Sequence, residues 1–572
     1  MLPKHFKTPL LVLLCLCNTV FAQSRYTVII SEIMFDPSPV VGLPNYEWIE
    51  LHNTSSAAIN LKGWRIGDET GISGPLPSFT LEPDSNVIVC SSTAAAAMRA
   101  WGTTLSVSSF PSLNNDGELL FLRSETGVTI HAVSYLPQWH NNEMKQEGGW
   151  SIEIINPKLP CIGQKNWTAS ADPIGGTPGR RNAVFRVIQD QTPPSLTQVF
   201  APNPQTLILT FDEPLDSASA VIPEHYTWEH GAVIPQKAEC LPPLFQQVQL
   251  QTITPLETGN ITMLSASNIT DCSGNKIGNR NTAKVGINAK STSSAIVINE
   301  LLFNPAGIGV DYIELYNRSS LVVNARELYI ANRSSSGSIT NIKAISTTDR
   351  PVFPGDFLLI AEDTMNVVKQ FPFHNQQVMI PLSNMPSLPD DRGQIVLLNT
   401  EGTILDEVAY DEKWHFALIS NREGVALERI HPSSPSRSQD SWASASKDLR
   451  YGTPGLQNSQ FRLPEIINGT IEVKPEIFSP DQDGHDDYVL LHYQFPENGY
   501  VMNCTVYNLA GRPVKYLQRN TLCGQTGTVR WDGLNEQQMK LPMGPYLIFT
   551  EVFNLRGRVK QFKNRVVLAR KQ

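Results

Sequence analysis

An internal repeat constrains the fold of this 572-residue chain more than any other feature. The two copies share three motifs in the same order: ISEIMFDP at 30–37 with INELLFNP at 298–305, WIELHN at 48–53 with YIELYN at 312–317, and GTPG at 176–179 with GTPG at 452–455. Each copy spans about 150 residues, far more than the roughly 20–50 residues of a solenoid unit. Each copy is therefore expected to be a whole domain.

The residues within and around the repeats predict strands. Short alternating runs, such as residues 48–52 and 394–398, are bounded by Gly, Pro, Asn and Asp. The 41 prolines and 37 glycines interrupt the chain too often for long helices. One short helix is expected at 93–101, where four alanines follow one another. At about 150 residues per domain, the length predicts about four all-β domains of the sandwich type.

The N-terminus predicts export. Lys4 and Lys7 precede an apolar run at 10–16 and a Val-Phe-Ala end at 20–22, so residues 1–22 are expected to be a signal peptide. That run is too short to cross a membrane, and no later stretch reaches the roughly 20 apolar residues of a transmembrane segment. The residues before Cys15 and Cys17 are too large for a lipid-attachment site. The mature protein is expected to be secreted or to lie on the outer cell surface.

The net charge limits the class of binding partner, and the cysteine content predicts disulfide bonds. The net charge of −9 is mild and the basic residues are scattered, so no nucleic-acid partner is expected. In an oxidising compartment, the six mature cysteines are expected to form three local disulfides in chain order: Cys90 with Cys161, Cys240 with Cys272, and Cys504 with Cys523. Fifteen pairings exist formally, and buried free thiols are the alternative.

The repeated motifs resemble those of the lamin tail domain, an Ig-like β-sandwich. The resemblance covers about residues 26–185 and 294–460, so residues 23–187 and 293–462 are identified as lamin-tail-like domains 1 and 2. The first copy continues with NLKGW at 60–64, a further motif of the family, whereas the second reads NAREL at 324–328. The resemblance implies that the chain is a string of Ig-like β-sandwiches.

The remaining segments resemble two other Ig-like modules. Residues 188–292, with a DCSGN turn at 271–275, resemble the SbsA-type Ig-like domain of bacterial surface proteins, which implies a spacer. Residues 463–572 resemble a FlgD-like Ig domain. In exported proteins such an end resembles the sorting signal of type IX secretion, which implies contact with that secretion machinery. A plain terminal β-domain is the alternative.

An aspartate-rich loop enters the last domain. Four carboxylates around a Gly turn can supply several of the six to eight oxygens that calcium takes, so the predicted metal ligands are Asp481, Asp483, Asp486 and Asp487. Weak calcium binding of the extracellular type is expected. An ordinary Asp-rich turn is the alternative.

Two carboxylates recur in each copy, namely Glu32 with Glu50 and Glu300 with Glu314. Such pairs could form a glycosidase site, but a glutamate in a strand more often accepts hydrogen bonds from the backbone. Alternation places Ile49 on the core face of its strand and Glu50 on the other. Metalloprotease, serine-hydrolase and phosphate-binding motifs are absent from the sequence, so no enzyme is expected.

These inferences predict a non-catalytic cell-surface binding or scaffold protein with a protein or glycan ligand. Trp64, Trp101 and Trp139 are candidate contact residues, with core packing as the alternative. A non-catalytic partner of secreted hydrolases or nucleases is the second hypothesis, and an extracellular hydrolase the third. Divergence between the copies predicts that the first copy binds the ligand while the second copy extends or supports the molecule.

Overall fold

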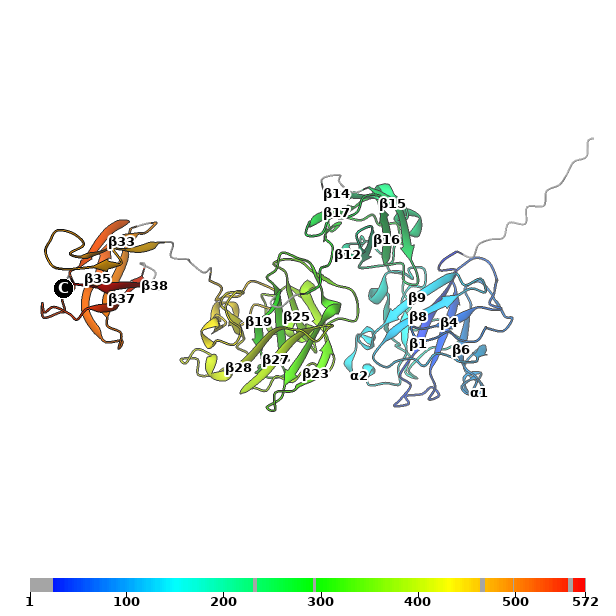
Figure 1. The fold of residues 1–572 in the computed structure, drawn as a ribbon. Helices are drawn as coiled ribbons and strands as arrows, with labels where there is room; N and C mark the ends of the chain where they lie inside the picture. Colours follow the sequence, from blue (N-terminus) through cyan, green and yellow to red (C-terminus); the bar gives the residue numbers. More distant parts are fainter. Residues whose placement is uncertain are drawn as a thin grey trace, which may run out of the picture. The chain divides into compact units, whose positions relative to one another are not determined.

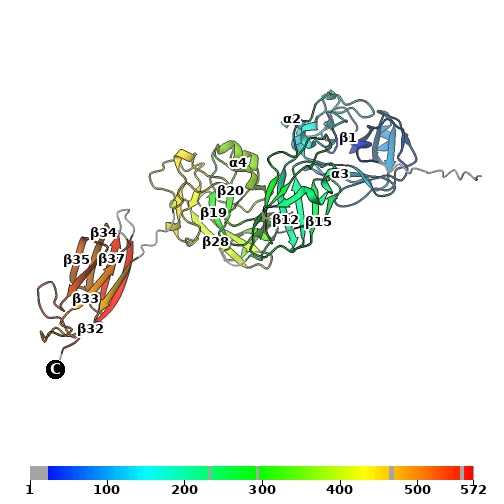
Figure 2. The same ribbon diagram turned by 90° about the horizontal axis from the view of Figure 1, so that it is seen from above.

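The computed structural model describes residues 24–229, 234–291, 295–462, 469–496, 498–553 and 559–570. The expected signal peptide lies outside these ranges. Contacts divide the chain into two compact units, residues 1–460 and 461–572, which are described separately. Strands dominate both units, as Figures 1 and 2 show, so the all-β prediction is confirmed. Across the described ranges, no helix has both the length and the apolar character needed to span a membrane.

The first repeat forms one large and two small sheets. All strand pairs are antiparallel except β6 with β7, at one edge of the large sheet. The six-stranded sheet has the order β11 (Trp167–Ala169), β10 (Ile152–Ile154), β1 (Val28–Met34), β2 (Trp48–Asn53), β6 (Asn86–Ser91), β7 (Thr104–Val107). The small sheets are β4 (Arg65–Gly67), β8 (Glu118–Arg123), β9 (Thr129–Tyr135), and β3 (Ile59–Asn60) with β5 (Thr80–Leu81). The helices α1 (Ala95–Met98) and α2 (Glu143–Gln146) are short, and α1 lies within the predicted helical segment.

The second repeat has the same strand order. Its six-stranded sheet runs β30 (Trp442–Ser444), β29 (Leu427–Arg429), β19 (Ile296–Leu302), β20 (Tyr312–Asn317), β25 (Phe357–Ala361), β26 (Met379–Pro381). The other strands are β22 (Leu328–Arg333), β23 (Ile339–Ala344), β27 (Arg392–Asn399), β28 (Ile404–Asp411), and β21 (Val323–Asn324) with β24 (Pro351–Val352). Helix α4 (Thr364–Gln370) takes the place of α1. The six-stranded sheets of the two repeats therefore share one strand order, whereas the opposing sheet has β23 as an additional strand in the second repeat.

The six-stranded sheet of the first repeat is covered on both faces. Ile49 and Leu51 enter the main core, which also contains residues of β8 and β9. Trp48 lies on the other face, in a smaller apolar cluster beneath α1. All six residues of β2 are buried. The alternation predicted the two faces of this strand correctly, but its outer face is buried as well.

The segment between the repeats forms a sandwich of two sheets. One sheet has the order β12 (Leu196–Asn203), β13 (Thr206–Phe211), β16 (Gln247–Thr252), β15 (Pro235–Leu241), and the other has β14 (Tyr226–Trp228), β17 (Thr262–Ala266), β18 (Thr282–Val285). The short helix α3 (Ser217–Ala220) is capped by Asp216, whose carboxylate accepts from two backbone amides. Leu207, Leu250 and Leu264 from both sheets meet in one core.

The C-terminal unit is a second kind of sandwich. Its sheets are β31 (Thr470–Lys474), β33 (Val489–Gln494), β36 (Thr526–Trp531), and β32 (Ile477–Phe478), β38 (Val559–Leu568), β37 (Gly544–Phe553), β34 (Tyr500–Tyr507), β35 (Pro513–Cys523). Trp531 from one sheet packs against Tyr546 from the other, with ring centroids 5.4 Å apart. The division of the whole chain into four domains stays a prediction.

Candidate functional site

A row of three glutamates crosses each six-stranded sheet. In the first repeat, Glu153, Glu32 and Glu50 lie opposite one another on β10, β1 and β2. The second repeat has an equivalent row of Glu428, Glu300 and Glu314 on β29, β19 and β20. All six side chains are fully buried. Like charges directly opposite one another in a sheet are destabilising, so these carboxyl rows need compensating contacts.

The Gly-Thr-Pro-Gly loop supplies those contacts in the first repeat. The Thr177 amide donates to Glu32 Oε1 at 2.8 Å, and the Gly179 amide donates to Glu50 Oε2 at 2.6 Å. The Thr177 hydroxyl lies 3.3 Å from Glu32 Oε2 and 2.9 Å from Glu153 Oε1. The loop is thus fastened to all three carboxyl groups of its row.

The second repeat reproduces this arrangement. The Thr453 amide donates to Glu300 Oε1 at 3.0 Å, and the Gly455 amide donates to Glu314 Oε2 at 2.5 Å. The Thr453 hydroxyl lies 2.8 Å from Glu300 and 3.0 Å from Glu428. The two loops therefore fasten to their carboxyl rows in the same way.

The geometry implies that the carboxyl rows are partly protonated. A threonine hydroxyl carries one hydrogen, so it donates to one of its two carboxyl neighbours and can bond the other only as an acceptor. Burial raises the pKa of Glu50 to about 8 and that of Glu300 to about 7. Burial and the neighbouring carboxylates raise the pKa of Glu32 and Glu314 well above its usual range. Neutral carboxyl groups can act as donors and remove the repulsion between neighbours.

The sequence identified two members of each row and missed the third. Glu153 and Glu428 lie on strands of three residues, too short for a clear alternation. Both nevertheless stand at the same distance before a tryptophan, Trp167 or Trp442, so a full alignment of the copies would have found them. In both repeats the loop covers the carboxyl groups, so none of the six faces solvent.

The aspartate-rich loop of the C-terminal unit gathers three of its four predicted ligands. Carboxylate oxygens of Asp481, Asp483 and Asp487 lie within 4.8 Å of one another. Asp487 also accepts from the amides of Gln482 at 2.5 Å and Gly484 at 2.9 Å. Asp486, the fourth predicted ligand, is not part of this group, and its carboxylate lies 3.3 Å from His485 Nδ1. These oxygens could form part of a calcium shell.

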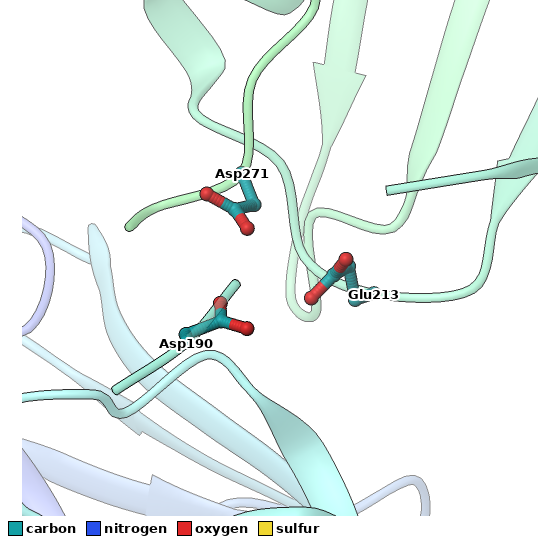
Figure 3. A group of neighbouring side chains, drawn as sticks. All are labelled: Asp190, Glu213 and Asp271. Carbon is teal, nitrogen blue, oxygen red and sulfur yellow. The ribbon is translucent and has the colours of Figure 1, made fainter. Parts of the chain in front are cut away.

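A second acidic cluster joins three separate segments of the first unit (Figure 3). Oxygens of Asp190, Glu213 and Asp271 lie within 4.8 Å of one another. Asp271 accepts from the amides of Ser273 and Asn275, both at 2.8 Å, as the predicted turn requires. Burial and then the nearby Asp271, Asp190 and Asp212 carboxylates raise the pKa of Glu213 to about 8. The cluster carries excess negative charge that a proton or a cation would neutralise.

The predicted disulfide pairing is wrong. The structure joins Cys161 to Cys272, which lie 111 residues apart in the chain, and leaves Cys90, Cys240, Cys504 and Cys523 as buried free cysteines. Cys90 lies in the apolar cluster beneath α1, and Cys240 lies in the core of the sandwich between the repeats. In the C-terminal unit, Cys504 pairs across the sheet with Gln518, whereas Cys523 lies opposite Tyr500. Register and core packing thus separate every predicted pair.

The three candidate contact tryptophans are not surface platforms. Trp64 is 1% exposed and Trp139 is 7% exposed, and both belong to the main core of the first repeat. Trp101 is partly buried against the cluster beneath α1. The alternative interpretation, core packing, describes Trp64 and Trp139 correctly.

Residues 22–137 match the family model of the lamin tail domain. No curated protein matches the sequence. Among solved structures, the N-terminal part of the bacterial S-layer protein SbsC is 14% identical, with 29% of this chain and 45% of that chain covered and a TM-score of 0.16. The chain thus spans less than half the length of that structure.

Two further solved structures are similar at the same low level. Latent PorU from Porphyromonas gingivalis is 10% identical, with 72% of this chain and 36% of that chain covered and a TM-score of 0.16. A calcium-stabilised adhesin with which an Antarctic bacterium binds ice is 7% identical, with 96% and 100% covered and a TM-score of 0.13.

Proposed function

We propose that this protein is a non-catalytic binding or scaffold protein that is exported to the cell surface. The Cys161–Cys272 bridge is the observation that carries the proposal, because disulfides persist in oxidising compartments outside the cytosol. The bridge fastens the lamin-tail-like first repeat to the Ig-like spacer. The second repeat, with the same strand order, is proposed to be another lamin-tail-like domain.

The non-catalytic part of the proposal rests on the carboxyl rows. The acidic residues common to both repeats are those that would suggest hydrolysis, and each is buried beneath a loop that it holds in place. A catalytic carboxyl group must reach its substrate at hydrogen-bonding distance. The hydrogen bonds between these glutamates and the loop are a sufficient structural reason for the glutamates to occur in both copies.

The C-terminal unit is proposed to direct export. Removing residues 464–572 should leave the remainder folded but prevent it from reaching the cell surface, since contacts separate this unit from residues 1–460. Labelling of intact cells with an antibody against the first repeat measures the outcome. Surface labelling of the truncated protein at the full-length level would refute the sorting role. Exclusive recovery of the full-length protein from the cytosol would refute export itself.

The aspartate-rich loop is proposed to bind calcium weakly. Three carboxylates at Asp481, Asp483 and Asp487 provide oxygen ligands on an exposed turn, and water would complete the shell. Calorimetry of the mature protein should show binding at millimolar calcium that the Asp483→Asn and Asp487→Asn double variant lacks. Equal calcium binding by that variant would contradict the assignment.

A further inference from the structure

The first repeat has a polar groove that none of the matched motifs explains. The groove has a volume of about 910 Å³ and lies where β2 and β10 end and β6 begins. Amide, hydroxyl and cationic side chains make up much of its lining, and the nearby Phe185 ring contributes apolar surface. Such a lining differs from the mainly apolar pockets of drug-like ligands. It fits a ligand with many polar groups.

The charge of the groove is positive. Lys158, Arg180 and Arg181 line it, and Asp84 is its one acidic lining residue. Arg180 is engaged by Asp172 at 3.0 Å, whereas Lys158 and Arg181 make no ion pair within the described part of the chain. The Arg181 guanidinium lies 3.5 Å from the centroid of the Phe185 ring. Two exposed cations therefore remain for a ligand.

Hydrogen bonds fix the floor of the groove. Asn86 Oδ1 lies 2.6 Å from His52 Nδ1, and the Asn86 amide group donates to the Arg180 carbonyl at 2.6 Å. His52 Nε2 lies 3.6 Å from Asp84. His52 and Asn86 are thus held in place before a ligand arrives, which lowers the entropic cost of binding to these two side chains.

The second repeat has the same framework but lacks the cations at the Lys158 and Arg181 positions and the His-Asn pair. Asn53 and Asn317 make equivalent hydrogen bonds, and so do Asn182 and Asn458. The sheet register and equivalent hydrogen bonds match the lining residues as follows: His52 with Tyr316, Asn86 with Phe357, Lys158 with Ser433, Arg180 with Leu456, and Arg181 with Gln457. The fold therefore does not require the cations or the His-Asn pair.

We infer that this groove is a binding site for an anionic oligosaccharide, with sugar hydroxyls on the amide and hydroxyl groups and carboxylate or sulfate groups on Lys158 and Arg181. A guanidinium binds carboxylate and sulfate through paired hydrogen bonds, and planar amides pair with hydroxyls. A peptide that binds as an added strand needs a sheet edge, but this groove lies at strand ends. The inference rests on the proposed surface-binding function and names its ligand class.

The test uses the mature full-length protein and four probes. They are a galacturonate hexamer, a sulfated hexasaccharide, a neutral glucan hexamer and a hexaglutamate peptide, each titrated calorimetrically at two salt concentrations. We expect binding of a charged saccharide, no binding of the neutral glucan, and weaker binding at high salt. The carboxylated and sulfated probes distinguish the two sources of charge.

Two matched variants locate the site. Lys158→Ser with Arg181→Gln should weaken saccharide binding at least tenfold, whereas Lys62→Ser with Arg99→Gln removes the same charge from exposed positions outside the groove and should leave binding unchanged. Equal thermal midpoints of both variants show that folding is intact. Unchanged binding by the first variant, preference for hexaglutamate, or no binding of either charged saccharide would each overturn the inference. Surface labelling of intact cells tests the proposed function independently.

Discussion

At the scale of single residues, the hydroxyl groups of Thr177 and Thr453 hold the carboxyl rows together. Each hydroxyl lies within hydrogen-bonding distance of two buried carboxyl groups. Replacing either threonine by valine keeps the shape but leaves two buried polar groups without that partner. We expect a loss of about 1–3 kcal/mol in the free energy of unfolding. Chemical denaturation measures it, and a serine variant, which retains the hydroxyl, should lose much less.

The carboxyl rows also predict how stability depends on pH. Burial raises the pKa of Glu50 to about 8, above the ordinary value near 4.5, so its stabilising contribution is complete below pH 4.5 and is lost as the pH rises to about 8. Glu50→Gln cannot ionise. The free energy of unfolding of this variant minus that of the wild type should therefore rise by up to about 4 kcal/mol between pH 5 and pH 9.

Denaturation midpoints at pH 5 and pH 9 provide the measurement. Glu125→Gln, at an exposed position of the same repeat, is the control and should show no such difference between the two pH values. A parallel pH dependence of Glu50→Gln and the wild type would show that Glu50 is ionised throughout this range in the folded protein.

At the scale of elements, a turn in the first repeat tolerates only glycine. Gly148 has φ +105°, and a Cβ atom there would lie 1.9 Å from the Ser38 carbonyl oxygen. Gly127 has φ +84° but has no atom within 4 Å of the same position. We expect Gly127→Ala to cost about 1 kcal/mol, from backbone strain alone, and Gly148→Ala to cost about 3 kcal/mol or more. Thermal unfolding of both variants separates the cost of backbone strain from the cost of the clash between the new Cβ atom and the Ser38 carbonyl. Equal losses of stability in the two variants would contradict this prediction.

The sequence predicted strands well because strand alternation is a local signal. The two faces of β2 were predicted from Ile49 and Glu50 alone. Burial of the outer face was not, because the loop that covers it comes from residues 176–179, more than a hundred positions later. The third glutamate of each row was missed because its strand has only three residues, and its neighbour in the sheet is distant in the chain.

The acidic cluster and the disulfide also depend on distant residues. Asp190, Glu213 and Asp271 come from three segments that no local motif connects. The pairing prediction assumed that each disulfide closes within one domain, whereas Cys161 and Cys272 meet across the junction between the first repeat and the spacer. Local sequence patterns therefore predicted the strands, whereas the acidic cluster and the disulfide depend on contacts between residues that are distant in the chain.

At the scale of the whole molecule, the Cys161–Cys272 bridge should stabilise the first unit. It closes a loop with a sequence separation of 111 residues, for which chain entropy predicts about 4–5 kcal/mol. Replacing both cysteines by serine should lower the denaturation midpoint by a corresponding amount. Reduction of the wild type should have the same effect, and neither treatment should change the unfolding of residues 461–572. Non-reducing peptide mapping that recovered a different pair would contradict the assignment.

The same bridge determines how the chain would carry mechanical load. When tension acts between the two ends of the protein, the covalent path runs through the two sulfur atoms and bypasses the residues between them. Those residues, the end of the first repeat and most of the sandwich between the repeats, lie off the covalent path of the load while the bridge is intact. After reduction, unfolding of these residues under load would add about 370–400 Å of extended chain, at roughly 3.3–3.6 Å per residue. The sandwich between the repeats could therefore lengthen the chain under load only once the bridge is reduced.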